Sequence, residues 1–198
     1  MMKKASRRHT FIAVLGITVL AFLILMSFAG AKQLVDTSSS GVDSLKNVYE
    51  KDIKTQDEAL RINPHNSTVW IDKGLALEDL NRFSEAVQAF DKAIVINPQD
   101  SFAWSSKGNA LTYLNKSEAI AAYDKAIEIN PHDSLVWNSK GDALVRLGKS
   151  DEAVKVYDKA IEIDPQNSIS WYFKGKALDK LGKSDEAQKA YDKAFNRS

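Results

Sequence analysis

Apolar residues recur at helical spacing through residues 67–198, and the whole pattern repeats about every 34 residues. In the first copy, Trp70, Gly74 and Leu77 lie 4 and 3 residues apart, a spacing that puts them on one face of a helix. The four tryptophans of the chain stand at intervals of 34, 33 and 34 residues: Trp70, Trp104, Trp137 and Trp171. Its four prolines keep the same intervals: Pro64, Pro98, Pro131 and Pro165. Such a period is typical of one helical unit copied end to end.

A second apolar stripe follows the first in each copy. Ala86, Phe90 and Ala93 lie 4 and 3 residues apart, so a second helix would place a ring between two small residues. The equivalent triplets also set an aromatic residue between alanines: Ala119, Tyr123 and Ala126; Ala153, Tyr157 and Ala160; Ala187, Tyr191 and Ala194. Each unit is therefore predicted to be a helical hairpin, over residues 67–100, 101–133, 134–167 and 168–198.

The turn between the two helices carries a stop signal and a start signal. Asparagine or glycine stands just past each first helix: Asn81, Asn115, Gly148 and Gly182. Both residue types tolerate the left-handed backbone that ends many helices. A serine followed by acids comes next: Ser84, Ser117, Ser150 and Ser184. We expect these serines to cap the second helices, and we expect both helices of the second copy to survive its one-residue-shorter turn.

Residues 44–66 look like the second half of a copy without its first half. Leu45, Ile53 and Leu60 follow a helical stripe. The stretch 57–64 matches the stretch 91–98 one period later. A degenerate terminal unit shields the first layer of a repeat stack, so we predict a capping helix here, preceded by a flexible linker over residues 32–43.

The N-terminal segment has a different pattern. Residues 11–31 carry no charge, and Phe11 to Phe28 form a nearly continuous apolar run. About 20 helical residues cross a hydrocarbon core of roughly 30 Å, so this run predicts a transmembrane signal anchor. A cleaved signal peptide is the alternative, since Ala29-Gly30-Ala31 fits a small-x-small cleavage site. The basic residues 1–10 favour a cytoplasmic N-terminus. The repeats would then be extracytoplasmic in a single-pass membrane protein, or secreted or periplasmic after cleavage.

Charge and composition narrow the class of partner. The chain of 198 residues has a formal charge of +1, but four of its 27 bases and none of its 26 acids lie in residues 1–31. The remaining chain is mildly acidic, which argues against a nucleic-acid partner. Because the chain has no cysteine, disulfides, thiol catalysis and cysteine metal sites are excluded.

No residue set predicts catalysis, a cofactor or a metal. His9 precedes the apolar run, and His65 and His132 each follow a proline at a turn between copies. Neither a metal site nor a hydrolytic triad can be assembled from them. The glycines are repeat-spaced singles without a phosphate loop. We therefore expect a protein that is not an enzyme. The aspartate–lysine runs of the second helices indicate a solvated face with i,i+4 pairs.

These residues resemble the tetratricopeptide repeat (TPR) family. The family pattern places an aromatic residue, a glycine and an apolar residue on the first helix, followed by alanine, aromatic, alanine and proline. The first copy matches it at seven positions: Trp70, Gly74, Leu77, Ala86, Phe90, Ala93 and Pro98. The resemblance covers about residues 44–198. It implies an all-α solenoid that forms a right-handed superhelical arc, here preceded by a single N-terminal hydrophobic helix, with a concave groove that binds a peptide or another protein.

The groove positions of the first helices vary between copies. We predict that a partner is bound by residues beside and opposite the tryptophan face: Ile71, Ser105, Asn109, Asn138, Asp142, Tyr172 and Lys176. These side chains are mostly neutral, so we expect a hydrogen-bonding groove and not a charged clamp for a C-terminal carboxylate. At the end of the chain, Tyr191, Ala194 and Phe195 predict an apolar edge that is open to self-association.

Two functions fit these observations. The first is a membrane-tethered, non-catalytic scaffold that binds a peptide segment or a partner protein in the groove. The alternative is an exported soluble accessory protein that binds a non-protein ligand such as a surface glycan, for which Tyr113 and Tyr172 would supply aromatic surface. Exposure outside the cytoplasm would also matter for three N-glycosylation sequons, although capping and turn chemistry explain the first two. They begin at Asn66, Asn115 and Asn196.

Overall fold

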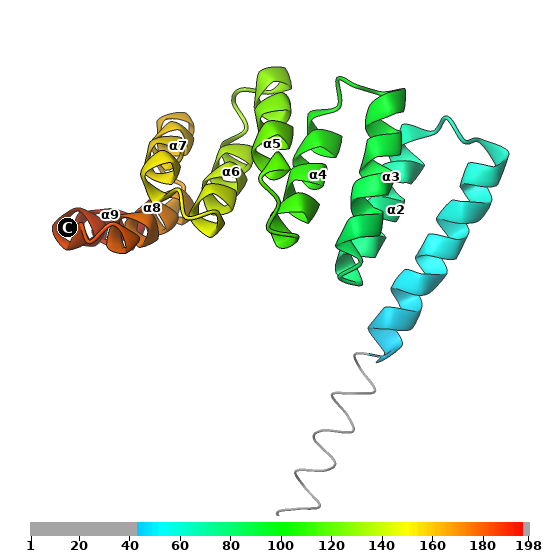
Figure 1. Ribbon diagram of the computed structural model, residues 1–198, viewed down its shortest axis with the longest axis horizontal. Coiled ribbons are helices and arrows are strands. Elements are labelled where there is room, and N and C mark those ends of the chain that lie inside the picture. Colours follow the sequence, from blue (N-terminus) through cyan, green and yellow to red (C-terminus); the bar gives the residue numbers. More distant parts are fainter. Residues whose placement is uncertain (1–42, 196–198) are drawn as a thin grey trace, which may run out of the picture. The chain divides into compact units, whose positions relative to one another are not determined.

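The computed structural model describes residues 43–195, which form helices joined by short turns (Figure 1). A half-repeat helix spans residues 43–62. Eight helices follow: α2 (Ser67–Asp79), α3 (Phe83–Ile96), α4 (Ser101–Tyr113), α5 (Glu118–Ile129), α6 (Ser134–Arg146), α7 (Ser150–Ile163), α8 (Ser168–Lys180) and α9 (Ser184–Ala194). Residues 43–195 contain no strand, so the predicted all-α solenoid is confirmed for this part of the chain.

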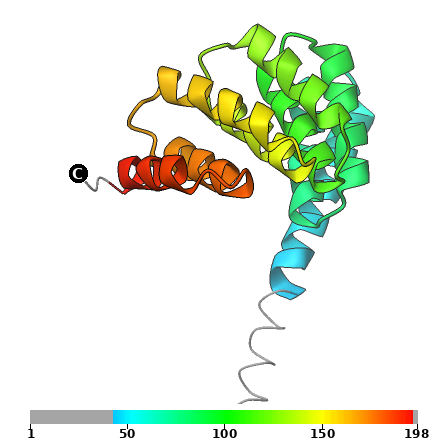
Figure 2. The ribbon, with the colours of Figure 1, turned by 60° about the vertical axis from the view of Figure 1, so that its left-hand side comes forward.

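The helices pack in chain order, from α2 and α3 through to α8 and α9 (Figure 2). Each first helix packs on the second helix of its own repeat, and each second helix packs on the first helix that follows. The first helices α2, α4, α6 and α8 also touch one another in succession. Within residues 67–194 no two second helices touch. The first helices therefore line the concave side of the array, and the second helices form its convex side.

A glycine of each first helix lies against an aromatic ring of the second helix in the same repeat. A Cβ atom on Gly141 would stand 2.4 Å from Cε1 of Tyr157, well inside van der Waals contact. The other three repeats have the same arrangement: Gly74 with Phe90, Gly108 with Tyr123, and Gly175 with Tyr191. Glycine within a helix is unfavourable by about 1 kcal/mol relative to alanine. The close approach of the ring explains why glycine is nevertheless used.

The turns confirm one sequence prediction and correct another. The residues just past the first helices have positive φ, as predicted: Asn81 at 57°, Asn115 at 53°, Gly148 at 77° and Gly182 at 73°. The predicted serine occupies the N-cap position only in the second repeat, as Ser117, and the prediction is wrong for the other three repeats; none of the four helices has a side-chain cap hydrogen bond. In three repeats the preceding basic residue is the N-cap, as Lys149 is for α7, so the serine falls inside the first turn. The first helices do have side-chain caps: Asn66, Asp100, Asp133 and Asn167.

The shortened second repeat keeps both of its helices, as expected. Its α5 has 12 residues, whereas α3 and α7 each have 14. Because the turn is one residue shorter, Ser117 itself occupies the N-cap position, with a helical φ of −62°. The deletion is thus absorbed at the start of the second helix, and the packing of α4 on α5 remains.

A tryptophan–lysine–aspartate contact joins each repeat to the preceding unit. In the third repeat, the ammonium of Lys140 lies 5.8 Å from the ring centroid of Trp137 and 2.5 Å from a carboxylate oxygen of Asp124. The indole N–H of Trp137 donates to the carbonyl of Pro131 at 3.0 Å. The same aspartate–lysine pairing recurs in the other repeats: Asp57 with Lys73, Asp91 with Lys107, and Asp158 with Lys174.

This contact corrects the interpretation of the aspartate–lysine runs. The aspartates do not simply face solvent, because each pairs with a lysine 16 residues later, in the next first helix. Two lysines of the same runs do lie on a solvated face and form pairs within their own helix, as predicted. Lys125 and Lys159 form exposed pairs with Glu128 and Glu162, although at i,i+3 spacing and not i,i+4.

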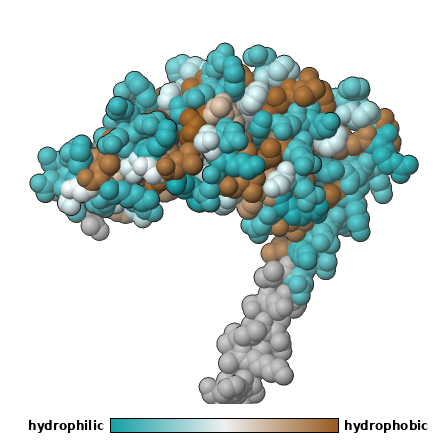
Figure 3. All heavy atoms as spheres, in the orientation of Figure 1, coloured by the Kyte–Doolittle hydropathy of each residue, from teal (hydrophilic) through white to brown (hydrophobic). Residues whose placement is uncertain are grey.

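The predicted anchor at Phe11–Phe28, residues 32–42 of the predicted linker at 32–43, and the sequon at Asn196 lie outside the described residues. Among the helices of residues 43–195, none has the length and apolar character needed to span a bilayer. Figure 3 shows apolar and polar side chains interspersed over one face of the described repeats.

Candidate functional site

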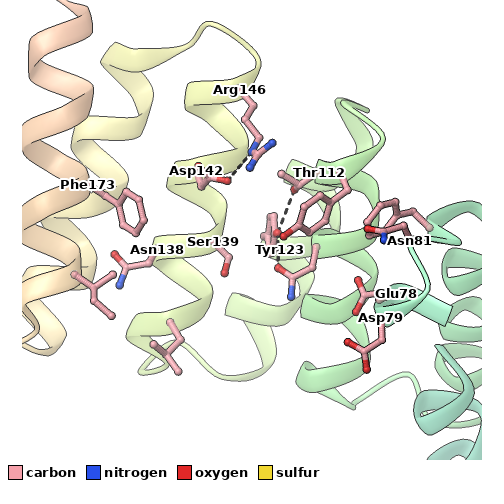
Figure 4. Close-up of a pocket in the computed structure, with 15 residues that line it drawn as sticks. Glu78, Asp79, Asn81, Thr112, Tyr123, Asn138, Ser139, Asp142, Arg146 and Phe173 are labelled. Carbon is pink, nitrogen blue, oxygen red and sulfur yellow. Dashed lines mark hydrogen bonds and ion pairs between the residues drawn. The ribbon is translucent and has the colours of Figure 1, made fainter. Parts of the chain in front are cut away.

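The concave side of the array carries a cleft of about 580 Å³. Figure 4 shows the side chains that surround it. They come from the first helices α2, α4, α6 and α8, from Asn81 in a turn, and from Phe83 and Tyr123 at the second helices. The cleft therefore spans all four repeats, and its chemistry is set by positions that differ from one repeat to the next.

The hydroxyl of Tyr123 organises the middle of the cleft. It donates to Oδ1 of Asn109 at 2.8 Å and lies 3.2 Å from Oγ1 of Thr112. The Thr112 hydroxyl in turn donates to the carbonyl of Gly108 at 2.8 Å. Burial raises the pKa of Tyr123 above its ordinary value, so the hydroxyl stays neutral at physiological pH. Oδ1 of Asn109 already accepts this hydrogen bond, and Nδ2 supplies the side chain's two donors.

Asn138 is the most deeply buried amide of the cleft. It is only 7% exposed, and its Nδ2 donates to Oγ of the buried Ser170 at 2.8 Å. Its Oδ1 is buried and has no hydrogen-bond partner among the described residues. An unpaired buried acceptor is unfavourable by about 1–3 kcal/mol. An N–H or O–H donor brought by a ligand would remove that penalty.

The end of the cleft at α2 is acidic. Glu78 and Asp79 are adjacent there, and Oε1 of Glu78 is buried without a hydrogen-bond partner among the described residues. Burial, with a smaller contribution from the neighbouring Asp79, raises the pKa of Glu78 to about 7. The Glu78 carboxylate is therefore poorly solvated and poorly compensated when it is ionised.

A cation in the cleft already has its partners. Nε of Arg146 donates to Oδ2 of Asp142 at 2.7 Å, and this hydrogen bond raises the pKa of Arg146. The guanidinium lies 5.5 Å from the ring centroid of Tyr113, which stacks on Phe83 with centroids 4.6 Å apart. Because the Arg146 and Asp142 charges cancel, the net negative charge of the cleft comes from Glu78 and Asp79.

Apolar side chains line part of the cleft. Leu135 is 62% exposed and Ile169 is 51% exposed, and both belong to the cleft lining. They occupy the same place at the start of α6 and α8, and Phe173 lies one turn further along α8. A ligand can therefore bury apolar surface here while its polar groups meet the amides and the carboxylates. No group of three or more metal-binding side chains gathers anywhere in residues 43–195.

Models of the tetratricopeptide repeat match most of this region. They cover residues 67–100, 103–133, 122–155 and 169–198 as tetratricopeptide repeats, and residues 141–182 as a TPR repeat. The chain is a tetratricopeptide-repeat protein. No curated protein is similar enough to count as a relative.

Solved TPR structures share the fold. A crystal structure of MamA is 25% identical, with a TM-score of 0.71 over 77% of this chain and 90% of that chain. MamA from Desulfovibrio magneticus RS-1 is 19% identical, with a TM-score of 0.70 over 75% of this chain and 85% of that chain. YrrB, described as a TPR protein with an unusual peptide-binding site, is 23% identical, with a TM-score of 0.64 over 77% of this chain and 79% of that chain.

The structure brings three of the predicted site residues of this TPR array together. Asn109, Asn138 and Asp142 line the cleft. Ser105 does not, and its hydroxyl donates to the carbonyl of Phe102 in its own helix at 3.0 Å. The prediction that Ile71 is a groove residue is wrong. Ile71 is 7% exposed and belongs to the core cluster that includes Ile53 of the half-repeat helix.

Tyr172 and Lys176 form a separate cluster near the end of the array. The ammonium of Lys176 lies 5.7 Å from the ring centroid of Tyr172, and the Tyr172 ring packs edge-on against Phe195 at 6.2 Å. Tyr191 is half-buried and Ala194 is buried. The predicted apolar edge is therefore smaller than expected, although Phe195 remains 56% exposed.

Sequence reasoning missed the acidic end and the Tyr123 network. Glu78 and Asp79 lie near the end of α2, one turn beyond the positions that the groove prediction considered. Tyr123 was assigned to the core, where its ring does lie, and its hydroxyl was not considered. The available signal was the comparison of repeats, since the position of Glu78 holds Thr112, Val145 and Asp179 in the other copies.

Proposed function

We propose that this TPR protein is a non-catalytic interaction scaffold that binds an extended peptide segment of a partner protein in the concave cleft. The observation that carries the proposal is the unpaired, buried Oδ1 of Asn138 in the cleft lining. An extended peptide supplies backbone N–H donors along its length. Its side chains would meet the apolar surface of Leu135 and Ile169. The peptide-binding site named for YrrB supports this class of ligand.

A photo-crosslinking experiment tests the proposal. Benzoylphenylalanine would be placed at Leu135, which is exposed in the cleft, and at Val95, which is 81% exposed outside it. We expect partner adducts from position 135 and not from position 95. Adding Asn138→Ala should reduce the adducts at least about tenfold, because a bound N–H would lose its acceptor.

Ser170→Ala is the matched control for Asn138→Ala. Both substitutions remove the hydrogen bond between these two side chains, but only Asn138→Ala removes the amide oxygen that has no hydrogen-bond partner among the described residues. Equal loss of adducts in both variants would show that packing of α6 on α8, and not recognition by Asn138, controls binding. Equal adducts at positions 95 and 135 would refute the cleft as the binding site.

We further propose that residues 11–31 tether the scaffold to a membrane with its repeats on the extracytoplasmic side. The support is the uncharged apolar run from Phe11 to Phe28 and the basic segment before it. Alkaline extraction of membranes should leave the full-length protein in the pellet. A mature protein shorter by about 31 residues would instead establish the cleaved signal peptide.

The glycan-binding alternative has weaker support. Of its two aromatic side chains, Tyr172 does not line the cleft. One face of Tyr113 is covered by Phe83 and its ring also meets Arg146. Sugar stacking needs an open aromatic face, so the peptide scaffold remains our proposal.

A further inference from the structure

Glu78 of the cleft has no hydroxyl partner, whereas Asp179 at the equivalent position of the fourth repeat has one. In the fourth repeat, Oδ2 of Asp179 accepts from the Tyr191 hydroxyl at 2.6 Å. In the second repeat, the equivalent pair is Thr112 and Tyr123, whose oxygens are 3.2 Å apart. In the first repeat, Glu78 occupies this position, but the residue equivalent to Tyr123 and Tyr191 is Phe90, which has no hydroxyl.

The absence of that hydroxyl explains why Oε1 of Glu78 is buried without a partner among the described residues. A buried carboxylate without a donor is strongly unfavourable in its ionised form. Burial also raises the pKa of Glu78 to about 7, which agrees with an unmet need for a donor or a positive charge. With Phe90 at the position that holds tyrosine in the other repeats, Glu78 of the cleft lining keeps a carboxylate oxygen without a donor.

The rest of the cleft supplies no cation to this carboxylate. The cleft has one basic side chain, Arg146, which is bound to Asp142 and lies over Tyr113. Next to Glu78 stands Asp79, a second acid of the lining. A ligand that enters the cleft thus meets uncompensated negative charge at the α2 end, and the α6 side of the lining holds the buried, unpaired amide oxygen of Asn138.

We propose that the peptide segment bound in the cleft carries a lysine or arginine whose cation pairs with Glu78 and Asp79, while a backbone N–H of the same segment donates to Oδ1 of Asn138. This inference rests on the peptide-binding function proposed above. Charge complementarity favours a basic side chain as the occupant of this end of the cleft. A lysine or arginine supplies both an N–H donor and a positively charged partner for the Glu78 carboxylate. Apolar residues of the segment would cover Leu135 and Ile169 between the two polar contacts.

A peptide array would test this with the full-length protein at pH 8, where Glu78 is ionised. The probes are N-acetylated, C-amidated decapeptides with one position fixed as lysine, arginine, norleucine or glutamate and the others randomised. We expect one fixed position at which lysine and arginine are retained about five- to tenfold better than norleucine, and glutamate worst. The double variant Glu78→Gln/Asp79→Asn should abolish the preference.

Two further variants sharpen the result. Asp151→Asn/Glu152→Gln removes the same amount of charge from an adjacent, exposed acid pair outside the cleft, and it should retain the full preference. Phe90→Tyr restores the hydroxyl that the other repeats have, and it should fold, because Tyr123 and Tyr157 occupy this position elsewhere. By donating to Glu78, the new hydroxyl should reduce the preference for lysine about two- to threefold.

The outcomes separate this inference from the function on which it rests. Peptide binding that needs Asn138 but shows no preference for lysine or arginine overturns the cation site and leaves the scaffold function intact. A preference that survives Glu78→Gln/Asp79→Asn also overturns it. If no peptide depends on Asn138, both proposals fail. If sedimentation instead shows a dimer that Asn138→Ala dissociates, the occupant is a second copy of the chain, and the peptide inference is wrong.

Discussion

The two edges of each first helix follow different rules. The edge that meets the preceding unit repeats one set of contacts four times, with the lysine of each tryptophan–lysine–aspartate contact 5.4–5.8 Å from its tryptophan centroid. The positions four residues after the helix glycines do not repeat: they hold Glu78, Thr112, Val145 and Asp179, and of these Glu78 and Thr112 line the cleft. Positions with the same residue type in every repeat therefore indicate how the units stack. Positions whose residue type varies between repeats indicate where a specific ligand is recognised.

The largest predicted effect tests the regular part. Gly141→Ala should destabilise the protein by about 3 kcal/mol, because the new methyl would stand 2.4 Å from Cε1 of Tyr157. The matched control is Gly148→Ala, where no atom lies within 4 Å of the Cβ but φ is +77°, and it should cost about 1 kcal/mol. Urea unfolding would measure both. A smaller loss at position 141 than at position 148 would mean that the glycine–ring packing is not the critical contact.

The second prediction concerns the hydrogen-bond network of Tyr123 in the cleft, which differs from repeat to repeat. Tyr123→Phe removes the hydroxyl that donates to Asn109 and should destabilise the protein by about 1–2 kcal/mol, since Oδ1 of Asn109 would lose its donor. Tyr157→Phe is the control, because no described residue hydrogen-bonds to the Tyr157 hydroxyl, and its stability should be nearly unchanged. Similar melting temperatures for the two variants would contradict a special role for the Tyr123 network.

Glu78 predicts a pH dependence of stability. A carboxyl whose pKa is raised by folding binds its proton more tightly in the folded state, so stability should fall as pH rises from 4.5 to about 7. Glu78→Gln should remove this slope and stabilise the protein at pH 8 by on the order of 1 kcal/mol, after allowance for partial solvent exposure.

The charged and titratable groups that line the same cleft are Asp79, Tyr113, Tyr123, Asp142 and Arg146. Asp79→Asn is therefore the companion variant, because it removes the neighbour that contributes to the raised pKa of Glu78. Urea titrations at several pH values would compare the two variants with the parent chain. Identical pH profiles for the parent and Glu78→Gln would show that Glu78 is not the group responsible.

The smallest effect concerns the ion pairs between units. A double-mutant cycle of Asp124→Asn and Lys140→Gln should give a coupling of about 0.5–1 kcal/mol, because the lysine side chain is only 16% exposed while the aspartate is 55% exposed. The exposed pair of Lys159 and Glu162 should give less and should lose its coupling in high salt. Equal couplings would mean that contact with tryptophan adds nothing to the pair.

The sequence predicted the stacking of the repeats well, because the residue types that make each stacking contact recur in several repeats. Gly141 and Tyr157 could be matched in advance from three other copies. The left-handed turn at Gly148 could be predicted from residue type alone. The aspartate–lysine pairing was missed because a local i,i+4 rule was applied to residues whose partners lie in the next unit.

The site was harder to predict, because it depends on single exceptions. Glu78 becomes informative only beside the Asp179–Tyr191 hydrogen bond, which shows what the missing hydroxyl at Phe90 would have done. Ile71 looked like a groove position by its place in the repeat, but the half-repeat helix contributes Ile53 to the same core cluster. An end unit can thus bury a position that Ser105 and Tyr172 leave at least partly exposed in their own repeats, and no periodic pattern contains that information.

The lysine of each unit reaches back by the same 16 residues to an aspartate of the unit before it. Every junction between units thus uses the same lysine–aspartate ion pair, whatever residues face the cleft. A duplicated segment such as 134–167 would carry its own lysine and aspartate and would dock on either neighbour. The array is therefore built so that its length can grow or shrink by whole units while the recognition surface changes independently.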